Sequence, residues 1–423
     1  MKLTDGEKRM LDGAEGPALA RALDYVVQLG DAFGAERLTD VSYVHYPAEM
    51  SIYRGSVEEL VEYAASGAKV AVPTTSSTLA CDLDQWPRTG CPAALAGLQG
   101  RAVAAHRALG VLGTYTCTPQ FLGFAPPRGA HIVSVESSAI IYFNSVLGAR
   151  TNRGGFLTRY SAVCGKYPLM GYLLDGNRGG THLFRCRLGA EDLRSPTDWS
   201  ALGFHAGKFA GSEVPVFEGL PRPTHIDLLA LGAALATSGS VTLFHAPPWT
   251  AEAGSVEAAF GGRIPKETRD VARADLDAAY DALTTIAPGE PVDFVSLGCP
   301  HLTLDGIRGI AEWLRGRAAR VAEGVRLWCN TNRMTRAAAA WEGAVAAIEA
   351  AGGLVVSDSC PVESHMRLST CREHGLAAPN VGAMVADSAK MARYVGDLIG
   401  CRTALAPRER CLEAAITGRF RGR

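Results

Sequence analysis

The chain has 423 residues, of which 47% are hydrophobic and 20% are charged, so it is long enough to fill one large core or several packed lobes. Its 42 basic and 43 acidic residues give a formal net charge of -1, a balance that provides no electrostatic footprint for nucleic acid or for an anionic membrane. We therefore expect no nucleic acid and no membrane among its partners.

The first residues, MKLTDGEKRMLDGAEGP, are charged and lack the apolar centre of a secretory signal. No apolar run in the sequence reaches the length that a bilayer-spanning helix needs. The 11 cysteines are scattered along the chain, a pattern typical of reduced thiols, metal ligands or catalytic groups rather than of a disulfide framework. We expect a soluble, cytoplasmic protein.

The chain opens with a helical pattern over residues 3–38, because apolar side chains recur there at helical spacing. Four later stretches share one order, a helix that stops at a glycine or turn and is followed by a short apolar strand and a loop, namely residues 56–78, 91–117, 276–301 and 336–362. Two further strands are predicted within residues 179–190 and 238–248. Residues 387–420 close the chain with two helices.

Helices that alternate with short Val-, Ile- and Leu-rich strands predict an α/β fold with largely parallel sheets. The passages richest in proline and glycine, residues 212–224 and 246–265, suggest a division into two lobes, 1–220 and 221–423.

Three cysteines share a setting, since each lies in a loop that follows a predicted strand and precedes a proline by one or two residues. They are Cys117, Cys299 and Cys360. In open α/β sheets such loops bind ligands. Three converging thiolates suit iron or an iron–sulfur cluster and leave an open position for a substrate. The alternative is that they are buried structural cysteines like the other eight.

The stretch ESSAIIYFNSVLGARTNRGG, residues 136–155, runs apolar and then ends in many hydrogen-bond donors. Two arginines can grip a carboxylate in bidentate fashion, so we interpret it as an anion site. The alternative is a buried salt network with Glu136 that joins two lobes. The candidate substrate-binding residues in this stretch are Ser137, Ser138, Asn144, Arg150, Asn152 and Arg153.

A second donor-rich loop, PTTSST, places Thr74 and Thr75 where they could bind a carboxylate or phosphate, or simply form a turn or helix cap. His45 lies near a predicted strand end and is either a ligand-binding or a packing residue. Lys390 could bring an ammonium group into the site or lie on a helix surface.

With TYTCTP, ESSAIIYFNSVLGARTNR, SLGCPH, DSC and SAKMARY in place, the sequence resembles the aconitase X family over nearly its whole length. The resemblance implies aconitase-type α/β lobes around a central metal site. It implies that Cys117, Cys299 and Cys360 hold a [2Fe–2S] or [4Fe–4S] cluster or mononuclear iron. The family pattern continues GARTNR with an acidic residue, where this chain has Gly154.

The resemblance also implies a hydro-lyase of a small hydroxy acid. The leading expectation is dehydration of cis-3-hydroxy-L-proline to Δ1-pyrroline-2-carboxylate, and the alternative is the large subunit of a mevalonate 5-phosphate dehydratase. A non-catalytic metal-binding scaffold subunit is the alternative from another class. Because the chain ends soon after the large-subunit motifs, we expect it to lack the swivelling domain. A separate small subunit would then supply the general base.

Overall fold

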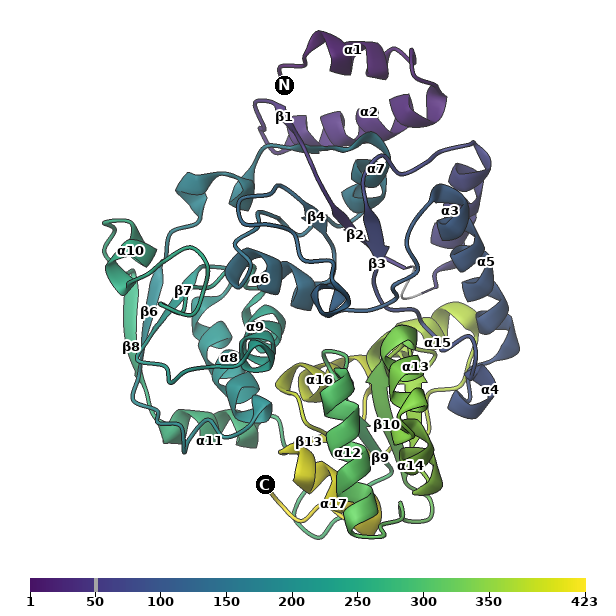
Figure 1. The fold of residues 1–423 in the computed structure, drawn as a ribbon, viewed down its shortest axis with the longest axis vertical. Helices are drawn as coiled ribbons and strands as arrows, with labels where there is room; N and C mark the ends of the chain where they lie inside the picture. The colour runs from purple at the N-terminus through teal and green to yellow at the C-terminus, as the bar shows by residue number, and fades with distance from the viewer. Residues whose placement is uncertain (49–51) are drawn as a thin grey trace.

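The computed structural model describes residues 1–48 and 52–423, and it divides into three lobes that each contain a sheet of parallel strands. In Figure 1 the first lobe lies at the top, the second at the left in teal, and the third at the bottom in green and yellow. The three meet in the middle of the molecule. This confirms the predicted α/β fold with largely parallel sheets.

The first lobe carries the parallel sheet β3-β2-β4 and the antiparallel pair β1-β5. Its strands are β1 (Leu38–Asp40), β2 (Val44–Tyr46), β3 (Thr74–Ser76), β4 (Val133–Ser134) and β5 (Lys166–Pro168). Its helices are α1 (Asp5–Leu11), α2 (Pro17–Ala32), α3 (Arg54–Ala65), α4 (Trp86–Thr89), α5 (Ala93–Leu109), α6 (Ser137–Ser145) and α7 (Leu157–Cys164). Short 3-10 turns are η1 (Pro119–Leu122), η2 (Gly171–Leu173) and η3 (Asp175–Asn177).

The helical pattern predicted over residues 3–38 is in fact two helices. Thr4 caps α1 with a reciprocal capping box, and α2 begins at Pro17, whose fixed φ suits a first helical position. Between them Gly13 and Gly16 have φ values of 87° and 101°, which end one helix before the next begins.

The second lobe has the parallel sheet β7-β6-β8, covered by a pair of close-packed helices. Its elements are β6 (His182–Cys186), α8 (Pro196–Ala210), β7 (Pro215–Glu218), α9 (His225–Gly239), α10 (Val256–Phe260), β8 (Glu267–Val271) and α11 (Arg273–Ala282). A Cβ on Gly203 would lie 2.2 Å from the Leu231 carbonyl oxygen, so α8 and α9 pack so closely that only glycine fits at this position.

Two expectations for this region differ from the structure. Residues 238–248 do not form the predicted strand. They make one bridge, between Val216 and His245, because Pro247 and Pro248 cannot donate to a ladder. The boundary expected at residues 220 and 221 falls in the loop between β7 and α9, which belong to one packed unit, so it is not where the sheets divide.

The third lobe is a five-stranded parallel sheet of order β11-β10-β9-β12-β13. Its strands are β9 (Phe294–Leu297), β10 (Arg326–Thr331), β11 (Leu354–Ser357), β12 (Ala383–Ala386) and β13 (Arg402–Leu405). Its helices are α12 (Leu304–Gly316), α13 (Arg333–Trp341), α14 (Ala344–Ala350), α15 (Leu368–His374), α16 (Ala389–Tyr394) and α17 (Arg408–Thr417), with the turns η4 (Pro361–Glu363) and η5 (Val395–Ile399). Across the described part of the chain, every helix is too short or too polar to cross a bilayer.

Candidate functional site

The carboxyl edge of the third-lobe sheet carries three of the predicted site residues. Cys299 follows β9, Cys360 follows β11, and Lys390 lies in the first turn of α16, which follows β12. Because the strands are parallel, these three loops leave the sheet at the same edge, the edge at which such sheets bind ligands.

The loop after β9 depends on a glycine. Gly298 has a φ of 96°, and a Cβ there would lie 2.4 Å from the Asn330 carbonyl oxygen. We therefore expect Gly298→Ala to lower the free energy of unfolding by at least about 1–3 kcal/mol, measured by denaturant unfolding. Gly100→Ala is the control, because that glycine lies inside α5 with open space around it, so the change should be neutral or slightly stabilising.

Cys117 reaches the same place from the first lobe. It does not follow a strand as predicted, since residues 111–118 are irregular apart from a single bridge between Thr75 and Leu112. The backbone N–H of His301 donates to Cys117 Sγ at 3.2 Å, and the N–H of Leu79 donates to the Asp358 carbonyl at 2.6 Å. These contacts join the first and third lobes beside the three cysteines.

All three cysteine side chains line one cavity of about 310 Å³. Each cysteine is only 7–9% exposed. Burial raises the pKa of Cys299 to about 12 and raises the pKa values of Cys117 and Cys360 as well. The remaining lining residues include Thr78, Glu136, Ser137, Arg153, His301, Glu363, Arg367, Lys390 and Tyr394.

A buried ion pair forms one wall of the cavity. Lys390 Nζ donates to Glu136 Oε1 at 2.8 Å, to Ser138 Oγ at 2.9 Å and to Ser137 Oγ at 3.1 Å. Burial alone would raise the pKa of Glu136, but the Lys390 ammonium and the Ser138 N–H hold it at about 2. Burial alone would lower the pKa of Lys390, but the Glu136 carboxylate beside it keeps that pKa well above its ordinary value. The site therefore contains a fixed ammonium beside hydroxyl donors.

His45, Thr74 and Thr75 lie near this wall but outside the cavity lining. His45 Nδ1 is 2.9 Å from Thr75 Oγ1, which also contacts the Tyr43 hydroxyl. Burial lowers the pKa of His45 to about 4, so the ring is neutral at physiological pH. The Thr74 hydroxyl donates to the Val72 carbonyl at 2.8 Å and forms part of a turn.

The other end of α6 makes different contacts. Asn144 donates to the Thr151 and Thr242 carbonyls at 2.9 and 3.0 Å, and Asn152 donates to the Met170 carbonyl at 3.0 Å. Arg150 pairs with Asp175 at 2.5 Å. A helix rises about 1.5 Å per residue, so Asn144 is about 10 Å along the axis from the serines at the start of α6. The structure does not bring these three side chains into the cavity lining.

Arg153 does reach the cavity, where its exposed side chain stands at the edge. Its closest described acceptors, the Ala236 and Val241 carbonyls, are 3.5 Å away. The neighbouring Gly154 has no room for a side chain, because a Cβ would lie 2.5 Å from Thr158 Oγ1 and 2.6 Å from Val133 Cγ1. A side chain at that position would require the Thr158 and Val133 side chains to shift.

Two lining residues were not singled out from the sequence. Glu363 lies in η4, the turn that follows Cys360, and Arg367 Nη1 donates to it at 2.8 Å. Burial raises the pKa of Glu363. Their i,i+4 spacing, directly after the Cys–Pro pair, could have indicated from the sequence that the two side chains form an ion pair near Cys360.

The donor chemistry of the three cysteines fits an iron or iron–sulfur centre. All are free, all face one cavity, and they come from separate rigid loops. In their present positions, no three His, Cys, Asp or Glu side chains among residues 1–48 and 52–423 are grouped to hold a metal ion. Loading would require the loss of the thiol protons, so metal affinity would rise with pH.

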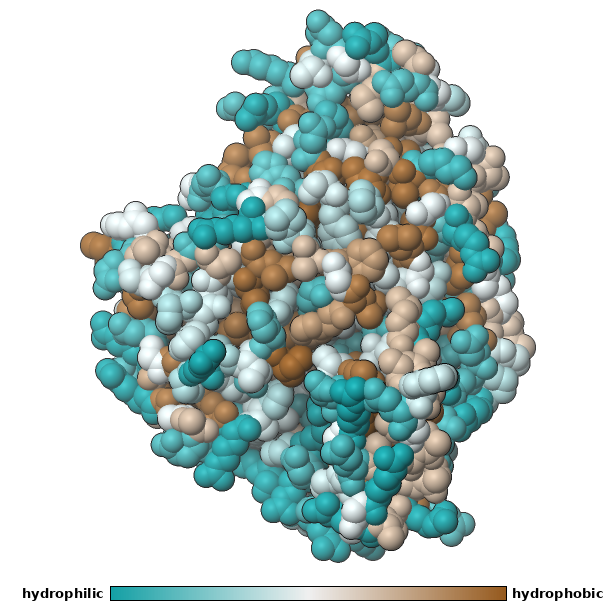
Figure 2. Space-filling model, in the orientation of Figure 1, coloured by the Kyte–Doolittle hydropathy of each residue, from teal (hydrophilic) through white to brown (hydrophobic). Residues whose placement is uncertain are grey.

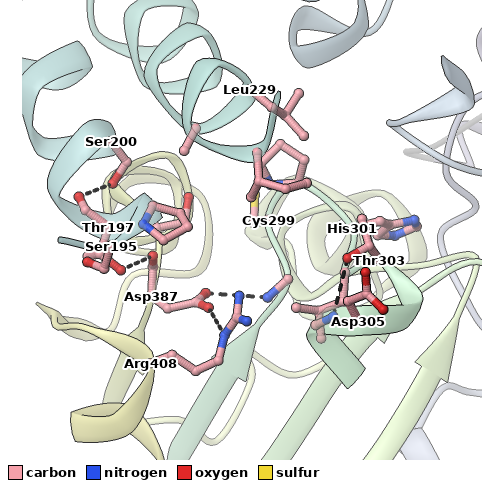
Figure 3. A pocket seen from close by; sticks show the side chains of 18 of the residues that line it. Ser195, Thr197, Ser200, Leu229, Cys299, His301, Thr303, Asp305, Asp387 and Arg408 are labelled. Atoms are coloured by element: carbon pink, nitrogen blue, oxygen red, sulfur yellow. Dashed lines mark hydrogen bonds and ion pairs between the residues drawn. The ribbon is translucent and has the colours of Figure 1, made fainter. Parts of the chain in front are cut away.

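A second cavity of about 410 Å³ lies on the other side of the Cys299 loop, between the second and third lobes. Figure 3 shows Cys299 and His301 in its wall, opposite Ser195 and Thr197 of the second lobe. Asp387 accepts from Arg408 Nε at 3.0 Å and from the Gly298 N–H at 3.4 Å, which holds the loop in place.

A third cavity of about 260 Å³ shares Leu302 and Thr303 with the second and is lined by apolar side chains such as Phe121 and Met334. The loop of residues 298–303 thus contributes to all three cavities. Figure 2 shows hydrophobic side chains gathered over the centre of this face of the molecule, surrounded by hydrophilic ones.

Comparison with known proteins gives the family. Residues 1–176 match the aconitase X first domain, residues 180–281 the aconitase X second domain, and residues 292–417 the aconitase X third domain. The matched ranges follow the three lobes of the structure.

Two relatives and one solved structure support the same family. The chain is 39% identical to the phosphomevalonate dehydratase large subunit of Methanothermobacter thermautotrophicus over 93% of this chain and 94% of that protein. It is 34% identical to the cis-3-hydroxy-L-proline dehydratase of Pseudomonas aeruginosa over 98% of this chain and 70% of that protein. The crystal structure of Thermococcus kodakaraensis aconitase X in its holo-form superposes with a TM-score of 0.85 at 31% identity, covering 98% of this chain and 100% of that one. The chain therefore belongs to the aconitase X family, and these two named relatives are dehydratases.

Proposed function

We propose that the chain is the catalytic large subunit of a hydro-lyase that removes water from a small hydroxy acid. The observation that carries this proposal is the cavity in which three buried thiols face a fixed lysine ammonium and several hydroxyls. A scaffold subunit would have no need for a cavity of this composition. We assign Cys117, Cys299 and Cys360 as the ligands of an iron or iron–sulfur centre.

The metal centre, when bound, would act as a Lewis acid on the departing hydroxyl group. The Lys390 ammonium, by exchanging its present contact with Ser137, and the Ser137 hydroxyl would bind the substrate carboxylate, and they would favour the negative charge that develops there as the neighbouring C–H bond breaks. Arg153 at the edge of the cavity would complete the carboxylate contact, because its guanidinium makes only long contacts in the free protein.

Arg153→Ala is expected to raise KM about 10- to 100-fold, since a charge-assisted hydrogen bond contributes about 1.5–3 kcal/mol. Arg150→Ala is the matched variant: its side chain pairs with Asp175 and lies outside the cavity, so KM should change less than about twofold. Steady-state kinetics with both variants test the assignment. Equal effects on KM would contradict it.

The charges in the cavity favour a zwitterionic substrate. The cationic residues that line the cavity are Lys390, Arg153 and Arg367. Lys390 already pairs with Glu136, and Arg367 already pairs with Glu363. A phosphomonoester with a carboxylate brings about three negative charges, for which this lining is poorly prepared. A cyclic amino acid brings one carboxylate and one ammonium group, and Glu136 or Glu363 can accept hydrogen bonds from that ammonium group. We therefore propose cis-3-hydroxy-L-proline as the substrate and Δ1-pyrroline-2-carboxylate as the product.

Mevalonate 5-phosphate is the second candidate. It is favoured by the 39% identity to the Methanothermobacter thermautotrophicus large subunit, which this chain matches almost end to end. The same name supports a separate small subunit, and we propose that this partner supplies the general base. The third cavity beside the 298–303 loop, where Phe121, Leu122 and Met334 are among the lining residues, is a fitting place for it to dock.

The test is anaerobic purification of the chain alone and with a co-expressed small subunit. Each preparation is assayed with cis-3-hydroxy-L-proline and with mevalonate 5-phosphate. Imine formation only in the presence of the partner is the expected result. Turnover of the phosphorylated substrate alone would replace the first candidate by the second. Ordinary turnover by the isolated chain would refute the proposed source of the base.

A further inference from the structure

The proposed reaction gives no role to His301, yet this residue stands where the three cysteine loops meet. It lies two residues after Cys299, lines both the cysteine cavity and the second cavity, and is 3% exposed. Its backbone N–H joins the Cys299 loop to Cys117 Sγ at 3.2 Å. In Figure 3 its ring points away from Ser195 and Thr197 of the second lobe. The ring is therefore available to the other two cysteine loops.

Both ring nitrogens of His301 are hydrogen-bonded, each to a different cysteine loop. Nε2 is 3.3 Å from the carbonyl oxygen of Ser359, the residue before Cys360. Nδ1 is 3.2 Å from the hydroxyl oxygen of Thr116, the residue before Cys117. A carbonyl oxygen can only accept, so Nε2 carries the proton, and the neutral ring then accepts the Thr116 O–H at Nδ1. One imidazole thus connects the two loops that come from different lobes.

The partners of the ring are themselves held in place. The backbone N–H of Thr116 donates to the Ser76 carbonyl at 3.1 Å, at the end of β3, and Ser359 forms an isolated bridge with Leu79. Thr116 and Ser359 are at most 2% exposed. Because solvent does not compete at such depth, the loss of either contact would leave a buried polar group unpaired.

We propose that His301 is a positioning residue that keeps the Cys117, Cys299 and Cys360 loops around one cavity before metal binds. The inference rests on the proposed function, since it takes these three cysteines as the ligands of the centre. The imidazole acts through the loops and does not touch the substrate. Thiols whose loops are already fixed lose less conformational freedom on binding a metal, so the centre would be retained longer.

The test compares His301→Asn and His301→Gln in the metal-free full chain. Asparagine places its amide near the Nδ1 position and keeps the Thr116 contact, whereas glutamine places its amide near the Nε2 position and keeps the Ser359 contact. The measurement is the rate at which iodoacetamide alkylates Cys117 and Cys360, followed by mass spectrometry of the tryptic peptides 108–128 and 337–367, each of which contains one cysteine.

His301→Asn should speed alkylation of Cys360 about 5- to 10-fold and that of Cys117 by less than about twofold, because one neutral hydrogen bond is lost on one side. His301→Gln should give the reverse. The same two substitutions at His106 are the control and should change neither rate. His106 is also fully buried, but its ring nitrogens have no hydrogen-bond partner within the described part of the chain. Equal acceleration of both thiols in both variants, or none in either, would overturn the proposal.

Thr116→Val tests the same contact with the imidazole left intact. It should speed alkylation of Cys117 as much as His301→Gln does, and the double variant should be no faster than either single one, because all three remove the same hydrogen bond. Additive effects of the two substitutions would overturn the assigned contact.

Iron retention separates this inference from the proposed function. Where the native chain carries iron, both His301 variants should lose it to a chelator at least about fivefold faster. Unchanged iron loss would overturn the link between His301 and the centre. A native chain without iron would refute the ligand assignment, whereas the alkylation rates, measured without metal, would still decide whether His301 holds the loops.

Discussion

Replacing Lys390 with methionine is expected to lower the free energy of unfolding by about 3–5 kcal/mol at neutral pH. Lys390 and Glu136 are 6% and 8% exposed and are 2.8 Å apart, so the variant would leave a carboxylate buried without its counter-ion. Urea unfolding of the native chain and of Lys390→Met at pH 7 gives the difference. Visible colour and turnover need not be measured, since the effect belongs to the folded protein itself.

The pH dependence gives this prediction its sign. In the native chain the pKa of Glu136 is about 2, below its ordinary value of 4.5, so its contribution to stability is present above about pH 4.5 and is lost as the pH falls towards 2. In the variant, burial without Lys390 raises that pKa, so ionisation at higher pH destabilises the fold. The gap between the two proteins should therefore be largest at pH 7 and smaller near pH 4.5.

The double variant Glu136→Gln/Lys390→Met is the control, because it also removes the Glu136 carboxylate that the single variant leaves buried without a counter-ion. It should recover a large part of the lost stability at pH 7. A gap that does not change with pH, or a double variant less stable than Lys390→Met, would show that the lysine acts by packing and not through the ion pair.

Replacing any one of Cys117, Cys299 and Cys360 with serine is expected to abolish the visible absorption of the anaerobically purified protein. Each thiol lines the same cavity, and a serine hydroxyl is a poor ligand for iron at a site built from soft donors. The measurement is the visible spectrum together with the iron content per chain. The loss should be close to complete in each variant, because the proposed centre has three protein ligands and no spare one.

Cys186→Ser is the matched control. Cys186 is also about 7% exposed and free, but it lies in β6 of the second lobe, outside that cavity. Its variant should keep the native spectrum. Equal loss of colour in all four variants would undo the ligand assignment, and unchanged colour in Cys117→Ser would remove the first lobe from the centre.

The sequence predicted the fold class and the placement of Cys299 and Cys360 because both depend on local patterns. Strand-then-cysteine order places Cys299 and Cys360 at one sheet edge once the sheet is parallel. Cys117 was selected for the wrong reason, since no strand precedes it. Its position depends on contacts such as the His301 N–H, 184 residues away in sequence, which no local pattern contains.

The donor-rich stretch of residues 136–155 shows the same limit. The closeness of these residues in the sequence suggested one anion site, but α6 separates the two ends of the stretch. Ser137 therefore faces the cavity, whereas Asn144 donates a hydrogen bond to the Thr242 carbonyl of the second lobe. Glu136 was considered only as a salt-bridge partner for arginine. The lysine that actually pairs with it lies 254 residues later, in a different lobe.

The contribution of all three cysteines from distant parts of the chain has a consequence for biosynthesis. Cys117 leaves the ribosome early, whereas Cys360 and Lys390 follow only after more than half of the chain has been added. At about 5–20 residues per second, the first thiol waits for tens of seconds before its neighbours exist. The three cysteines can therefore come together only near the end of translation, so the iron centre proposed for them would have to be delivered to an almost finished polypeptide.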